Sequence, residues 1–198
     1  MKTPGSPRVS HGPAPADASD HPIRLSLPLM TIAVVSLGAG IVSGGVAYLG
    51  RSPQREEHVA GTAAWWPHLA LLVLAVVVVL VLRRRSRSLR TLILAPLGSR
   101  AARRLRRTLA SAWRRPTVAL RLLAGLVPML LLAYIPWRVG EQILGGLDPN
   151  FTANAWGGPS YPGAMACHYL DSALLVGAAA GLLNVLLLPA GPSRRDHR

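Results

Sequence analysis

The chain has 198 residues, of which 51% are hydrophobic, and its formal net charge is +14. Because Cys167 is its single cysteine, no intrachain disulfide can form, which excludes a small secreted domain held together by disulfides. The apolar residues are concentrated in four long blocks instead of short periodic runs, and this distribution is typical of an integral membrane protein.

The N-terminal segment, residues 1–27, is rich in Pro, Ser and His and poor in large apolar side chains, so we expect a disordered tail. The first apolar block, residues 28–49, is longer than the apolar region of a signal peptide and lacks a cleavage pattern of small residues, so we expect a retained membrane span. Within it, Gly40 and Gly44 lie four residues apart, which allows close packing of two helix backbones in lipid.

The second block, residues 64–82, contains no polar side chain after His68. A helix that is apolar on every face belongs in lipid. The third block, residues 117–137, is equally apolar apart from Arg121 near its start. Each block is close to the roughly 20 residues that an α-helix needs to cross a hydrocarbon core, so both are predicted membrane spans.

Between these two spans, residues 83–116 contain twelve Arg and no Asp or Glu. Apolar residues recur there at every fourth position from Leu97 to Trp113, and most arginines lie on the opposite face. This pattern is typical of a basic amphipathic helix in the membrane interface. The arginines predicted to bind anionic lipid are Arg103, Arg104, Arg106 and Arg107. A protein partner is an alternative, but no zinc ligands or aromatic stacking platform indicate nucleic acid.

The fourth block, residues 167–189, contains a second pair of glycines at four-residue spacing, Gly177 and Gly181. The two glycine motifs predict a close contact involving the first and fourth spans, either within one chain or across a homodimer. The short segment 190–198 completes the chain as a basic tail.

The distribution of charge predicts the orientation of the chain. Loop 83–116 and the C-terminal tail are basic, whereas residues 139–166 contain Glu141 and Asp148 and no Lys or Arg. Because basic loops stay on the cytoplasmic side, we expect both termini inside and loop 138–166 outside. The 21 Arg against one Lys favour a bacterial source and hence the bacterial plasma membrane. The predicted fold is an all-α integral membrane protein with four transmembrane helices and a basic interfacial helix in its cytoplasmic loop.

Ionisable side chains gather at the predicted outer end of the spans. His168 and Asp171 share one face of the fourth span, with Arg138 and Glu141 expected at a similar depth. In a structural interpretation, Asp171 pairs with Arg138. In a transport interpretation, these four residues form a proton or cation relay. In a third, His68 and His168 bind haem or copper.

The sequence contains no recognisable catalytic motif, such as a nucleophile elbow, a zinc-protease helix or a phosphate-binding loop. We therefore expect a non-enzymatic accessory or interaction protein without a cofactor, acting in a homo-oligomer or with another membrane protein. The alternative is a small transporter or channel subunit that uses the His168 and Asp171 site.

Overall fold

The computed structural model describes residues 24–84 and 94–189. The predicted disordered tail, most of which is residues 1–23, the middle of the Arg-rich loop and the C-terminal tail lie outside these ranges. Four helices in the described ranges are long and apolar enough to cross a membrane: α1 (Leu27–Leu49), α2 (Trp65–Arg84), α5 (Pro116–Gly145) and α7 (Tyr161–Leu186). No β-strand occurs in the described ranges, so the predicted all-α class and its four apolar helices are confirmed.

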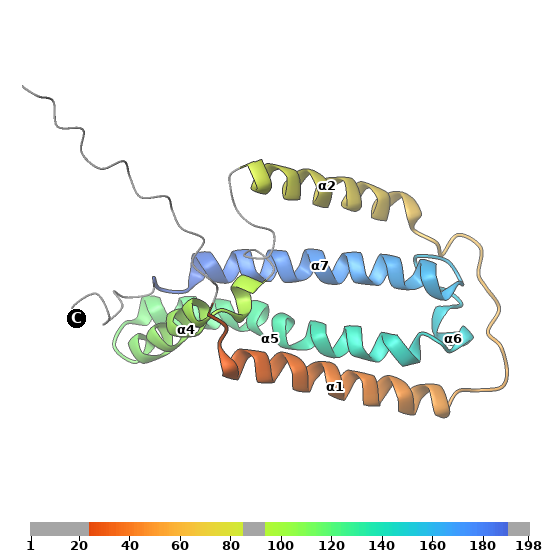
Figure 1. The fold of residues 1–198 in the computed structure, drawn as a ribbon, viewed down its shortest axis with the longest axis horizontal. Coiled ribbons are helices and arrows are strands. Elements are labelled where there is room, and N and C mark those ends of the chain that lie inside the picture. The colour runs from red at the N-terminus through yellow and green to blue at the C-terminus, as the bar shows by residue number, and fades with distance from the viewer. Residues whose placement is uncertain (1–23, 85–93, 190–198) are drawn as a thin grey trace, which may run out of the picture.

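The four long helices form a row in the order α1, α5, α7, α2 (Figure 1). α5 packs between α1 and α7, and α2 lies on the other side of α7. Two short helices, η1 (Ala95–Leu97) and α4 (Ser99–Ala112), lie at the end where α5 begins, and α6 (Pro149–Thr152) lies at the opposite end. We call these the α4 end and the α6 end.

Two of the helices are longer than the predicted spans. α5 continues about two turns beyond residue 137, to Gly145, although Pro128 and Pro136 lie inside it. A proline removes one backbone donor, and neighbouring helices can stabilise the rest of such a helix in a membrane protein. α7 begins at Tyr161 instead of residue 167, where Ser160 caps it by accepting a hydrogen bond from the Gly163 amide. Much of the predicted loop 138–166 is therefore helical.

α1 and α5 are in direct backbone contact. A Cβ atom added at Gly40 or Gly44 would lie 1.9 or 2.0 Å from a backbone oxygen of α5. One added at Gly140, on α5, would lie 2.3 Å from a backbone oxygen of α1. Only glycine fits at these three positions, because any side chain would force the two helices apart.

The two glycines of α7 have a different environment. Among the described residues, no atom lies within 4 Å of a Cβ added at Gly177 or Gly181. The predicted contact between the first and fourth spans is therefore not formed within the described chain. α5 lies between α1 and α7, and Gly140 provides the third small residue that the α1 glycines need.

At the α4 end, an arginine of α4 binds the C-terminus of α7. Arg104 donates hydrogen bonds to the backbone oxygens of Asn184, Leu187 and Leu188 at 2.7, 2.6 and 3.1 Å. The fully buried Thr108 hydroxyl accepts a hydrogen bond from the Leu188 amide at 3.0 Å. The last carbonyls of a helix lack partners within it, and a cation there is favourable. Arg104, which we predicted to bind lipid, thus has a partner within the protein.

The start of α1 is bound to the same end. The Ser26 amide donates to the Leu97 oxygen at 2.8 Å, and the Ser99 amide donates to the Arg24 oxygen at 2.7 Å. This short bridge joins α1 to η1 and α4, so α4 contacts or bonds the ends of three of the four long helices.

The glycine contact predicts a sharp difference between two substitutions in α1. Gly44→Ala should lower the free energy of unfolding of the detergent-solubilised protein by about 1–3 kcal/mol, and with it the melting temperature, because the new methyl group overlaps the α5 backbone. Gly38→Ala is the matched control, since an added Cβ there meets no described atom within 4 Å. Equal melting temperatures for the two variants would contradict the close contact of α1 with α5.

Candidate functional site at the α6 end

Asp171 of α7 pairs with His68 of α2. The Nε2 atom of His68 lies 3.2 Å from Oδ2 of Asp171, and the His68 residue is only 6% exposed. Its other ring nitrogen, Nδ1, lies 2.7 Å from the Ala64 oxygen. The prediction that Asp171 pairs with Arg138 is therefore wrong. The partner comes from α2, on the opposite side of α7 from α5.

The geometry requires a proton between His68 and Asp171. A carbonyl oxygen can only accept, so the hydrogen bond to Ala64 places a proton on Nδ1 of His68. The contact of Nε2 with the carboxyl group then needs a second proton, either on Nε2 or on Asp171. The pair is thus an imidazolium with a carboxylate or a neutral imidazole with a carboxylic acid.

Arg138 pairs within its own helix instead. Its guanidinium bonds the carboxylate of Glu141, three residues later on α5, and lies 5.3 Å from the centroid of the Phe151 ring. This pair exists because α5 continues past residue 137 and brings positions three apart onto one face. Arg138 and Glu141 therefore form a second charge pair at the α6 end.

His168 lines a cleft together with Arg138. The cleft has a volume of about 300 Å³, and its polar lining includes Arg138, Asn150, Asn154, Trp156 and His168. His168 makes no side-chain hydrogen bond among the described residues, unlike His68. The structure thus brings His168 and Arg138 to one cavity and places Asp171 in a separate pair with His68.

The wall of this cleft is built by residues that the sequence analysis did not single out. The side-chain oxygens of Asn150 and Asn154 accept hydrogen bonds from the amides of Glu56 and Val59, at 2.8 and 2.9 Å. These bonds fix the segment between α1 and α2 against the segment that follows α5. The sequence signal was the density of Asn, Pro and Gly after residue 147, which predicts turns but not their partners.

Trp156 joins the cleft to the His68 pair. Its backbone oxygen accepts a hydrogen bond from the Ala64 amide at 2.7 Å, and its ring centroid lies 5.5 Å from that of His68. The first turn of α2 is therefore fixed by the segment following α6 as well as by Asp171.

One further polar group at this end is buried without a partner. Gln142, on α5, is 1% exposed, and its Oε1 atom accepts no hydrogen bond from any described residue. A buried amide oxygen without a hydrogen-bond donor is unfavourable, so Gln142 lowers the stability of the folded protein.

The described residues bear on the predicted metal or haem site in two ways. They contain no group of three or more His, Cys, Asp or Glu side chains that could hold a metal ion. Nδ1 of His68 carries a proton, and Nε2 faces Asp171, so neither nitrogen of His68 is available as a ligand in this arrangement. His68 contacts Asp171 and His168 lines the cleft, so binding of haem or copper by these two residues stays a prediction.

No protein-family model, no curated protein and no solved structure matches this chain. Its function is therefore inferred from its own residues.

A double-mutant cycle tests the His68 pair. His68→Ala and Asp171→Ala should each lower the thermal stability of the protein in detergent, and the double variant should lose less than their sum, because each single change already breaks the pair. A polar pair between membrane helices is worth about 0.6 kcal/mol on average and at most roughly 1.7 kcal/mol.

Arg138→Ala serves as the control partner in this cycle. Because Arg138 pairs with Glu141, its effect should add to that of Asp171→Ala. Coupling of Asp171 with Arg138, together with additivity of Asp171 with His68, would reverse the assignment of partners.

Proposed function

We propose that this chain is a multi-pass protein of the bacterial plasma membrane, with the α4 end in the cytoplasm and the α6 end outside. Residues 94–115 at the α4 end contain seven Arg and no Asp or Glu. The α6 end carries only three Arg, at positions 51, 55 and 138, beside the acidic residues Glu56, Glu57, Glu141 and Asp148. Such an asymmetry of basic residues orients membrane proteins with the basic end inside. Both termini then lie in the cytoplasm.

We further propose that the protein is a non-enzymatic interaction protein that acts as a homodimer or in a larger membrane complex. The observation that carries this proposal is the contrast between the two glycine motifs. The glycines of α1 are covered by α5, whereas Gly177 and Gly181 of α7 are exposed and meet no neighbouring helix among the described residues. Small residues at four-residue spacing are the usual means of close helix packing in lipid, so a second α7 helix is the natural occupant.

The remainder of the fold supports an interaction role. His68 is the only buried residue of α2, so nearly the whole of that helix is free to contact lipid or a neighbouring helix. Outside the four long helices, the described ranges contain only η1, α4 and α6, of 3, 14 and 4 residues. Elements of this size do not form a separate catalytic domain.

Closing the exposed glycine face should weaken self-association. Gly177→Leu combined with Gly181→Leu should raise the dimer dissociation constant in liposomes about tenfold or more, as measured by energy transfer between labelled copies, because the bulky side chains keep the backbones apart. Gly38→Leu is the control, since Gly38 is also exposed and lies on α1. Unchanged energy transfer in the α7 variant would remove α7 as the dimer contact.

Transport is the second candidate function, and one observation favours it. The proton-bearing pair of His68 and Asp171 lies at the same end as the cleft lined by Arg138 and His168, where a cation or proton could enter. Against it, the four long helices contain no Asp or Glu other than Glu141 and Asp171, so no acidic group continues a path toward the α4 end.

Proteoliposomes distinguish the two functions. A transporter should show a proton flux that Asp171→Asn abolishes, because the amide side chain of asparagine does not take up or release a proton at physiological pH. For the interaction protein proposed above, the expected result is no flux above that of empty liposomes, in the wild type and the variant alike.

A further inference from the structure

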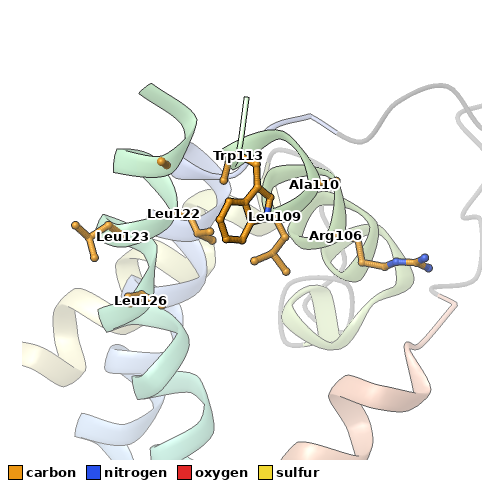
Figure 2. A pocket seen from close by; sticks show the side chains of 9 residues that line it. Arg106, Leu109, Ala110, Trp113, Leu122, Leu123 and Leu126 are labelled. Carbon is orange, nitrogen blue, oxygen red and sulfur yellow. The ribbon is translucent and has the colours of Figure 1, made fainter. Parts of the chain in front are cut away.

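An apolar groove lies between α4 and α5 at the α4 end (Figure 2). Its volume is about 650 Å³, and its walls are almost entirely carbon. Leu109 and Trp113 extend from α4 toward Leu122 of α5, and Leu123 and Leu126 continue the wall along α5. The groove is thus formed by one membrane-crossing helix and the short basic helix packed against its first turns.

The position of the groove indicates what can fill it. Its α5 wall belongs to a helix that is long and apolar enough to cross the membrane. α4 lies at the first turns of that helix, at the depth where hydrocarbon gives way to head groups. A groove of leucines at this depth excludes water and offers dispersion contacts to a hydrocarbon chain.

The rim of the groove is polar in a specific way. Trp113, a residue that is 95% exposed, stands at one end of it, and tryptophan favours the level of the lipid head groups. Arg106 stands on the α4 rim with its guanidinium directed away from α5, so the interior of the groove stays apolar. The arrangement matches a ligand with one hydrocarbon chain and an anionic head.

The four arginines of α4 that we predicted to bind lipid differ in their hydrogen bonds. Arg104 and Arg107 donate hydrogen bonds to backbone oxygens at the end of α7, Arg107 to Pro189 at 2.9 Å. Arg103 donates to Ser99 on its own helix, and only Arg106 of these four both lines the groove and makes no hydrogen bond among the described residues. On the far flank of α4, Arg114 and Arg115 line a second cleft and add to the positive charge.

We propose that this groove is a binding site for one anionic phospholipid, with an acyl chain between α4 and α5 and the phosphate at Arg106. The proposal rests on the membrane placement proposed above. It goes beyond general attraction of basic residues to lipid, because it assigns the head group to one arginine and the chain to one groove. Charge complementarity selects the ligand: residues 94–115 contain seven Arg and no acidic side chain.

Native mass spectrometry of the full-length protein in mild detergent tests the site. Phosphatidylglycerol and phosphatidylcholine with identical acyl chains are titrated separately, so the two ligands differ only in the head group. The wild type should bind one phosphatidylglycerol at least about fivefold more tightly than phosphatidylcholine, as expected for one close arginine.

Two pairs of matched variants distinguish the contribution of the lipid head group to binding from that of the acyl chain. Arg106→Gln should remove most of the preference for phosphatidylglycerol, whereas Arg103→Gln, one turn away on α4 and outside the groove, should keep it. Ala119→Phe, which fills the groove, should weaken binding of both lipids about tenfold, whereas Ala124→Phe, exposed on the same helix but outside the groove, should not.

Two results would overturn the proposal. Equal losses in the Arg106 and Arg103 variants would show diffuse charge attraction without a site, and equal binding by the Ala119 and Ala124 variants would show that the groove holds no chain. The same spectra report the ratio of dimer to monomer. A loss of the lipid site with an intact dimer, or the reverse, therefore tells the failure of this proposal from the failure of the proposed function.

Discussion

The fold depends on the backbone contact between α1 and α5. In a bilayer the surrounding lipid is as apolar as the side chains, so helices associate through close van der Waals contact and polar bonds instead of hydrophobic burial. Gly40, Gly44 and Gly140 provide the close contact, since each places a helix backbone where a methyl group would overlap it. α7 then packs on the other side of α5, and the hydrogen bonds of Arg104 fix its C-terminus. The row of helices is thus built outward from one glycine contact.

α2 is held by a different kind of interaction. Its apolar residues are exposed along its length, and its buried residue, His68, lies near its beginning. There His68 meets Asp171 and Trp156, and the Ala64 amide bonds the Trp156 oxygen. α2 is therefore attached at the α6 end by polar and aromatic contacts, and in Figure 1 it diverges from α7 toward Arg84. These few contacts near its start thus position a helix that has almost no packing of its own.

The sequence predicted the four apolar helices well, because length and uniform apolarity are properties of each segment alone. It failed where a residue's role depends on a neighbouring helix. Because the third span was predicted to end at residue 137, Gly140 was placed in a loop and its contact with the α1 glycines was missed. For the same reason Arg138 was predicted to pair with Asp171, whereas it pairs with Glu141 on the same helix. Both α5 and α2 lie beside α7, so whether Asp171 meets Arg138 or His68 depends on which side of α7 it occupies, which no local pattern encodes.

The two ends of the molecule satisfy their polar groups differently, and this difference bears on function. At the α6 end most polar side chains bond one another, since His68, Asp171, Arg138, Glu141 and Asn150 all have partners within the chain. Groups with internal partners stabilise one arrangement and leave little for a ligand, apart from His168 and its small cleft. At the α4 end, Arg104 and Arg107 also have partners within the chain, whereas Arg106 lines an apolar groove. The surfaces left without partners among the described residues are therefore this groove and the glycine face of α7, and both α5 and α7 are long and apolar enough to cross a membrane. The proposed role as an interaction protein within the membrane rests on these two surfaces.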